Sequence, residues 1–236
     1  MSSAACQTAS MPDQAVFWGE VLNANLTCFQ TSPESRLIPG SGQVCTHMID
    51  FTPACERTAS LLQTVTDEQL DGPTPCEKLS LRDLVGHVGG LAPAFTAAAR
   101  KDFGPLTDSP PVEGAPLDED WRTAYPQRLA ELAGAWRDPA AREGMTRAGG
   151  VDFPAEVGGI VALTEVVIHG WDIATATGQD YDVDPATLEA VLPHVTATAE
   201  QGPVEGLFGP AIPVADDAAM LDRVIALSGR DPVRCA

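Results

Sequence analysis

Apolar and small residues fill the stretch Ala155–Thr177 almost without a break, and they occupy every side of a helix. A helix that is apolar all round is a buried helix, so this stretch predicts the central helix of an all-α fold. Only a few polar groups interrupt it, among them Glu165, His169 and Asp172, at offsets of four and three residues. These offsets place the three side chains on one helix face. Because unpaired buried charges cost several kcal/mol, we expect a compensating partner, and a metal ion is the candidate.

Further helical patterns lie before and after this central stretch. They cover residues 51–65, 81–101, 117 or 118 to 136, 185–200, and 216 or 217 to 228. Ser80 and Asp83 form a capping box ahead of the second helix, in which Pro93 predicts a kink because it lacks a backbone donor. Asp216 or Asp217 is the expected cap of the last helix.

The order of these elements predicts a four-helix bundle with an extension. The first four helices, within residues 48–180, form the bundle, and Pro154 and Gly178 mark the ends of its central helix. Residues 145–153 predict a short β-like turn, and residues 181–236 a C-terminal helical extension. Residues 1–47 are rich in Ser, Thr, Gln, Gly and Pro. We expect them to be disordered or an over-extended reading frame, with Met48 as the natural start.

Charge and cysteine usage narrow the functional classes. The formal charge of −19 argues against nucleic-acid partners and against anionic membranes. No signal-peptide pattern opens the chain, so we expect a cytoplasmic protein. The 6 cysteines show no CxxC spacing, which favours reduced thiols. GxGxxG, P-loop and GxSxG motifs are also absent from the sequence, so it supports neither a nucleotide cofactor nor a serine hydrolase.

Glu165 and His169 lie one helical turn apart and can both reach a single ion. A third ligand must come from another helix, and His87 is the histidine that lies on the small, apolar face of a bundle helix. The other candidates are His47 in the N-terminal segment and His194 on a later helix. Two imidazoles and one carboxylate suit a catalytic Zn²⁺ with an open position, and also Fe²⁺ or Ni²⁺. From spacing alone, hydrogen-bonded core histidines are an equally good interpretation.

Asp172 is the candidate for a catalytic role. We expect it to orient His169 or to assist proton transfer, in preference to binding the metal directly. Arg223 and Arg230 could pair with an acidic substrate or with the carboxylate of a thiol cofactor, but surface or helix-capping arginines are the favoured interpretation. Cys76 could act as a nucleophile or form a mixed disulfide, although a partly buried structural cysteine is favoured.

The aromatic residues on the helices are expected in the core rather than in a ligand cage. They are Trp121, Tyr125, Trp136 and Trp171.

Four segments give the chain a resemblance to a known family. They are TPC at 74–76 with LRDLVGHV at 81–88, EVVIHGWD at 165–172, and DRVIALSGRDP at 222–232. With them the chain resembles the DinB-like proteins and, more closely, the mycothiol-dependent maleylpyruvate isomerase metal-binding-domain family. The resemblance implies a DinB-like four-helix bundle and a divalent metal, zinc, held by His87, Glu165 and His169, with mycothiol as a cosubstrate.

The chain also departs from that family. Many relatives have Trp before the capping box, where this chain has Leu79, and the isomerase itself carries a distinct C-terminal domain, where this chain has a short tail. Maleylpyruvate as the substrate is therefore not implied. The leading hypothesis is a metalloenzyme of S-transferase or isomerase type that activates a low-molecular-weight thiol toward a small electrophile. The alternatives are a metal-dependent hydrolase that uses activated water, and a non-catalytic metal-binding regulatory module.

Overall fold

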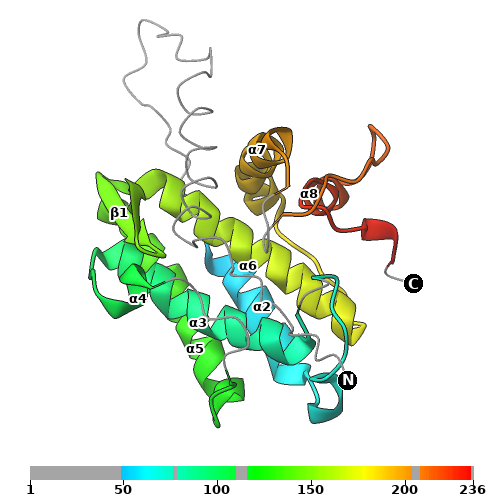
Figure 1. Ribbon diagram of the computed structural model, residues 1–236, viewed down its shortest axis with the longest axis horizontal. Helices are drawn as coiled ribbons and strands as arrows, with labels where there is room; N and C mark the ends of the chain where they lie inside the picture. The colour runs from blue at the N-terminus through cyan, green and yellow to red at the C-terminus, as the bar shows by residue number, and fades with distance from the viewer. Residues whose placement is uncertain (1–48, 77–78, 110–115, 204–207, 235–236) are drawn as a thin grey trace, which may run out of the picture.

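The computed structural model describes residues 49–76, 79–109, 116–203 and 208–234, so the predicted disorder of 1–47 lies outside the described residues. Four long helices form the bundle: α2 (Thr52–Thr64), α3 (Leu81–Arg100), α5 (Trp121–Trp136) and α6 (Ala155–Thr177). Helices α2 and α3 each pack against both α5 and α6 (Figure 1). The prediction of an all-α four-helix bundle is confirmed.

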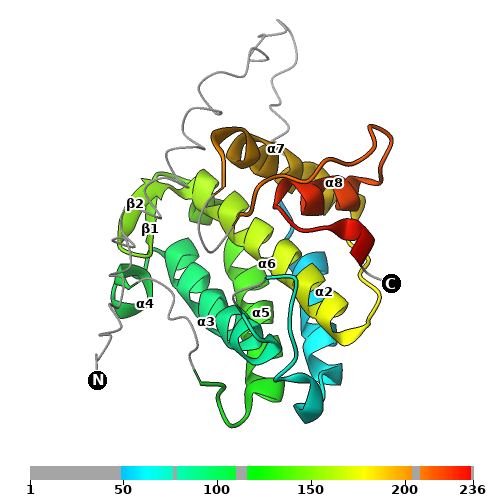
Figure 2. The same ribbon diagram turned by 45° about the vertical axis from the view of Figure 1, so that its right-hand side comes forward.

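Helix α6 is buried on all sides because it has neighbours on all sides. Every residue from Ala155 to Ala174 except Glu156 is buried. Helices α2 and α3 cover its bundle side, and α7 (Pro185–Gln201) packs against it from outside the bundle (Figure 2). Among the described residues, α6 is also the helix long and apolar enough to span a membrane, but its apolar window lies entirely inside the protein. Its composition is therefore that of a core helix.

Smaller elements complete the fold. Strands β1 (Met145–Ala148) and β2 (Val151–Pro154) form an antiparallel hairpin that confirms the predicted β-like turn. Its two loop residues, Gly149 and Gly150, both have positive φ, as a two-residue turn of type I′ requires. Helix α8 (Met220–Leu227) packs against α7. The short helical turns are η1 (Asp67–Gln69), α4 (Pro105–Asp108), η2 (Pro139–Arg142) and η3 (Pro232–Arg234).

The predicted caps hold at two helices. Ser80 Oγ accepts from the Asp83 amide, and Asp83 Oδ2 accepts from the Ser80 amide. Gly178 ends α6 in the left-handed conformation. Helix α3 continues through Pro93 to Arg100. Pro93 has no backbone N–H to donate to the Gly89 carbonyl, which accepts instead from Arg128 Nη1 at 3.1 Å.

Two predicted helix starts were wrong. Helix α5 begins at Trp121, not at 117 or 118, because Asp118 lies before the helix and pairs with Arg128. Helix α8 begins at Met220, with Ala219 at the cap position. Asp216 lies in an exposed turn closed by the Ala218 amide and the Ala215 carbonyl. The aspartates that were expected to cap α8 therefore belong to that turn.

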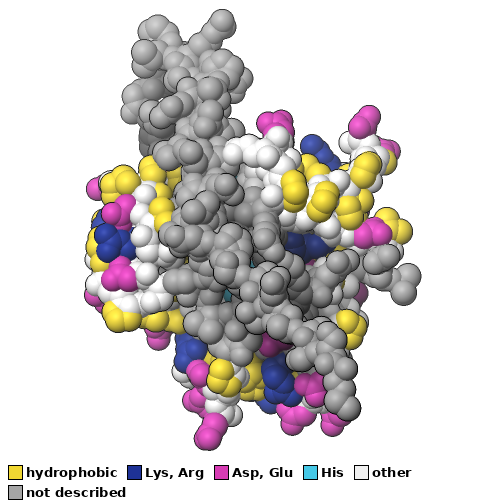
Figure 3. Space-filling view, viewed as in Figure 1, with side chains coloured by type: hydrophobic (Ala, Val, Ile, Leu, Met, Phe, Trp, Pro, Cys, Tyr) yellow, Lys and Arg dark blue, Asp and Glu magenta, His cyan; other side chains and the backbone are white. Residues whose placement is uncertain are grey.

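Acidic side chains are spread over the visible face of the molecule, with basic ones in small separate groups among them (Figure 3). Several arginines are engaged by carboxylates, as Arg147 is by Asp108 and Asp152.

Candidate metal centre

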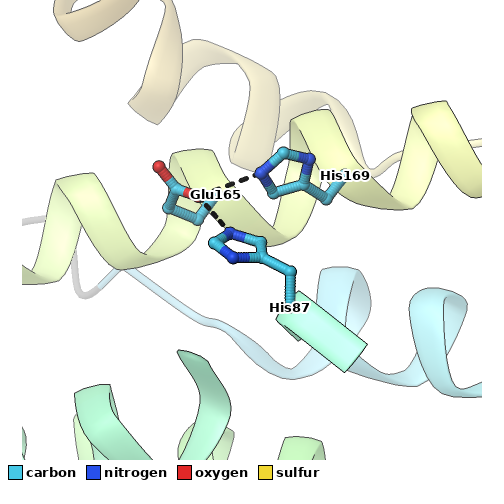
Figure 4. A group of neighbouring side chains, drawn as sticks. All are labelled: His87, Glu165 and His169. Carbon is cyan, nitrogen blue, oxygen red and sulfur yellow. Dashed lines mark hydrogen bonds and ion pairs between the residues drawn. The ribbon is translucent and has the colours of Figure 1, made fainter. Parts of the chain in front are cut away.

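The three predicted ligands come together from two helices. His87 projects from α3, and Glu165 and His169 project from α6 toward it (Figure 4). Glu165 Oε2 lies 3.1 Å from His169 Nε2 and 3.5 Å from His87 Nε2. The two imidazole rings meet edge to face, with centroids 4.8 Å apart. Residues separated by 78 positions in the sequence therefore form one cluster.

The spacing of this cluster suits a metal ion. One donor atom from each residue lies within 4.8 Å of the other two. Tetrahedral Zn²⁺, with bonds of about 2.0–2.2 Å, places neighbouring donor atoms about 3.4 Å apart. The separations of 3.1 and 3.5 Å from the carboxylate to the two histidines match that requirement. Two imidazoles with one carboxylate are also a donor set that catalytic zinc sites use.

Close packing fixes α6 beside the cluster. A Cβ atom on Gly170 would lie 2.5 Å from Tyr181 Oη and 2.7 Å from Thr58 Oγ1, so only glycine fits next to His169. The Tyr181 hydroxyl donates to the Val167 carbonyl at 3.0 Å. These contacts hold the turn of α6 that carries His169. The side chains of Glu165 and His169 are only 4% and 2% exposed, whereas that of His87 is 20% exposed.

The pKa values of the two buried candidate ligands, Glu165 and His169, move in opposite directions. Burial alone would raise the pKa of Glu165, but hydrogen bonds from His169 and His87 hold it well below its usual range. Burial alone would lower the pKa of His169, but Asp172 and Glu165 accept from both ring nitrogens and raise it to about 9. In the metal-free protein the cluster is thus a compensated ion pair. A metal ion can replace the proton as the positive partner of Glu165.

Asp172 lies behind His169, as predicted. Its Oδ2 is 3.1 Å from His169 Nδ1, on the opposite side of the ring from Glu165. An ionised carboxylate there accepts the Nδ1 proton and leaves Nε2 directed at the cluster. Asp172 is not among the residues whose donor atoms converge at the cluster. Its position therefore supports an orienting role.

The interpretation of Arg230 as a surface arginine was wrong, although its Nη1 does donate to the Ser228 carbonyl at the end of α8, as a capping arginine would. Its side chain is 5% exposed, and its guanidinium donates to both oxygens of Asp172, at 2.8 to 3.1 Å. Burial would raise the pKa of Asp172, but the charge of Arg230 lowers it, so Asp172 stays ionised. The sequence motif at 222–232 had drawn attention to Arg230. Its pairing with Asp172 was missed because 58 residues separate them.

Among the described residues, the remaining candidates are not part of the cluster. Arg223 is exposed on α8, and Cys76 is partly buried before α3. His194 is buried on α7 with its ring against Phe208, and His47 lies outside the described residues.

The four aromatic residues are buried, as expected for core residues. They are Trp121, Tyr125, Trp136 and Trp171.

Comparison with known proteins finds relatives in Mycobacterium tuberculosis. Two uncharacterised proteins of Mycobacterium tuberculosis, one from strain CDC 1551 / Oshkosh and one from strain ATCC 25618 / H37Rv, are each 33% identical to the chain over 160 residues. The aligned part is 67% of this chain and 80% of each relative. No solved structure matches the chain.

A family model matches residues 51–174, which run from the start of α2 to the last turn of α6 and contain all three candidate ligands. Its description is the mycothiol maleylpyruvate isomerase N-terminal domain. The match covers more than half of the chain and extends over the four bundle helices, from α2 into α6. The chain belongs to the mycothiol maleylpyruvate isomerase N-terminal domain family, a DinB-like family.

Proposed function

We propose that the protein is a metal-dependent enzyme that activates a low-molecular-weight thiol, mycothiol. The activated thiol would either be transferred to a small electrophile or catalyse isomerisation of that electrophile. The observation that carries the proposal is the convergence of His87, Glu165 and His169 on a space that fits one ion. Family membership points to the thiol. Zinc is the metal we propose, because the donor set and its spacing suit Zn²⁺.

The charge of the donor set favours an anionic fourth ligand. Glu165 contributes one negative charge, and neutral His87 and His169 contribute none, so a divalent ion leaves the site with one positive charge. A divalent ion held there would lower the pKa of a bound thiol and present it as thiolate. Glu165 and His169 are almost fully buried, and this low-dielectric setting strengthens the attraction for an anion.

The chain's own residues supply the orientation. Asp172 accepts the Nδ1 proton of His169 and so keeps Nε2 available as the metal ligand. The partly exposed His87 marks the side of the cluster from which a small molecule can approach. We assign Asp172 the orienting role and His87, Glu165 and His169 the role of metal ligands.

The test is a turnover assay of the zinc-loaded protein with mycothiol and a panel of small electrophiles, maleylpyruvate included. We expect turnover that needs both zinc and thiol, and its loss in Glu165→Gln, which keeps the size of the side chain but removes its charge. Glu156→Gln, on the exposed first turn of the same helix, is the matched control and should retain activity.

Two other results would contradict the proposal. Turnover without any thiol would identify a hydrolase that uses activated water. Zinc bound at this site with no turnover across the panel of thiols and electrophiles would identify a metal-binding module without catalysis.

A further inference from the structure

Arg230 is a buried cation whose guanidinium donates to a buried carboxylate. Its Nε donates to Asp172 Oδ1 at 2.8 Å, and its Nη2 donates to Asp172 Oδ2 at 3.0 Å. Asp172 is 0% exposed, so without Arg230 its charge in the core would keep only the hydrogen bond from His169. The carboxylate that orients His169 is thus itself held by a residue from the far end of the chain.

A rigid backbone arrangement delivers Arg230 to this position. Its amide donates to the Ile225 carbonyl at the end of α8, and its Nη1 donates to the Ser228 carbonyl at 3.2 Å. Gly229, with φ +84°, lies against Gly209, and a Cβ on Gly229 would be 2.4 Å from the Gly209 Cα. The Gly209 amide in turn donates to the Ser228 carbonyl at 3.0 Å.

These contacts form a continuous series that ends at the candidate metal centre. Backbone contacts at 209 and 229 fix Arg230, Arg230 fixes Asp172, and Asp172 accepts from His169 Nδ1 at 3.1 Å. Because both carboxylate oxygens are occupied by Arg230, the plane of Asp172 cannot rotate without breaking a charged hydrogen bond. A fixed Asp172 fixes the His169 ring and the direction of its Nε2 lone pair.

We propose that Arg230 is a positioning residue of the metal centre, which it stabilises through Asp172 and His169. The C-terminal segment therefore takes part in building a site whose ligands all lie within the family match at 51–174. This inference rests on the metal centre of the proposed function, but it does not depend on the thiol chemistry.

The test measures Co²⁺ affinity and the Co²⁺ visible spectrum in the full-length protein. We expect Arg230→Gln to bind Co²⁺ about 10- to 100-fold more weakly, with an altered spectrum. Arg230→Lys keeps the charge but not the planar pair of donors, so it should lie between Arg230→Gln and the wild type. Arg223→Gln, an exposed change on α8, is the matched control and should bind as the wild type does.

A double-mutant comparison tests whether Arg230 acts on the metal centre through Asp172. If Arg230 acts through Asp172, Arg230→Gln combined with Asp172→Asn should bind Co²⁺ no more weakly than Asp172→Asn alone. Losses that add would overturn the route, and wild-type affinity in Arg230→Gln would overturn the inference. Should Arg230→Gln fail to fold, Arg230→Lys decides alone. Weaker Co²⁺ binding at an unchanged melting temperature supports the inference, and unchanged binding overturns it.

The outcome separates this inference from the proposed activity. Wild-type protein that binds Co²⁺ but transfers no thiol contradicts the activity, while weaker binding by Arg230→Gln still supports the positioning role. Unchanged binding by Arg230→Gln, in a wild type that transfers thiol, contradicts the positioning role alone. A wild type that binds no Co²⁺ contradicts both.

Discussion

His169 on α6 and His194 on α7 are both buried, at 2% and 5% exposure, yet their pKa values shift in opposite directions. Carboxylates lie at both ring nitrogens of His169, and its pKa is raised to about 9 although burial opposes the shift. His194 has its ring against Phe208. Burial lowers its pKa to about 4, and the charge of Glu165, which acts to raise the pKa, is the smaller influence.

The difference shows that carboxylates, more than depth of burial, determine what a core histidine can do. His169 has Glu165 four positions before it and Asp172 three positions after it, and a helix places both beside its ring. At the same offsets His194 has Ala190 and Ala197. We therefore interpret His169 as part of a metal site and His194 as a core residue.

The largest expected effect is on zinc binding, where substitutions of the two histidines should give different results. His169→Ala should abolish stoichiometric zinc binding, because it removes a ligand from a site of three, whereas His194→Ala should leave one ion per chain. Elemental analysis of the purified, zinc-equilibrated proteins measures this directly. Full zinc occupancy in His169→Ala, or its loss in a folded His194→Ala, would invalidate the assignment.

A second prediction makes the surroundings of His169 resemble those of His194. Asp172→Ala leaves Arg230 buried without its carboxylate partner and leaves His169 with Glu165 alone, so the free energy of unfolding should fall by about 3–5 kcal/mol. Urea denaturation of the metal-free protein provides the measurement.

Asp216→Ala, in the exposed turn before α8, is the control and should change stability by less than about 0.5 kcal/mol. A loss in Asp172→Ala as small as this would mean that the buried ion pair contributes little to the fold.

The smallest expected effect concerns pH. Since the pKa of His194 falls to about 4 in the folded protein from about 6.5 when unfolded, the unfolded state binds the proton more readily. The contribution of His194 to the free energy of unfolding is fully present above pH 6.5 and is lost as the pH falls toward 4, because protonation then favours the unfolded state. Between pH 8 and pH 5 this group should cost about 2 kcal/mol.

Urea titrations at pH 8 and pH 5 should show this cost in the wild type and not in His194→Leu. The relevant quantity is the difference between the two pH values within each protein, because the substitution also changes packing. The same pH dependence in both proteins would contradict the interpretation of His194 as a buried neutral residue.

Local sequence patterns were sufficient to predict much of the fold. The all-round apolar run predicted α6, and the Ser80 capping box and Gly178 marked helix ends that the structure confirms. The starts of α5 and α8 were missed because aspartates serve ion pairs and turns as readily as caps, and periodicity does not distinguish these uses.

The part of the candidate site that depends on spacing along a single helix was predictable from the sequence. Offsets along α6 brought together Glu165, His169 and Asp172, and an apolar face of α3 pointed to His87. The convergence of α3 on α6 is a tertiary contact, and so is the pairing of Arg230 with Asp172 across 58 residues. Neither contact leaves a periodic signal in the sequence, which is why Arg230 was misjudged.

The most direct test of the central claim is a Co²⁺ titration of the full-length protein, followed by addition of mycothiol and monitored in the visible and near-ultraviolet range. We predict one Co²⁺ per chain, with a sulfur-to-cobalt charge-transfer band that appears when the thiol is added and is absent in Glu165→Gln. Binding of Co²⁺ with no spectral change at saturating thiol, or the same band in Glu165→Gln, would contradict the account.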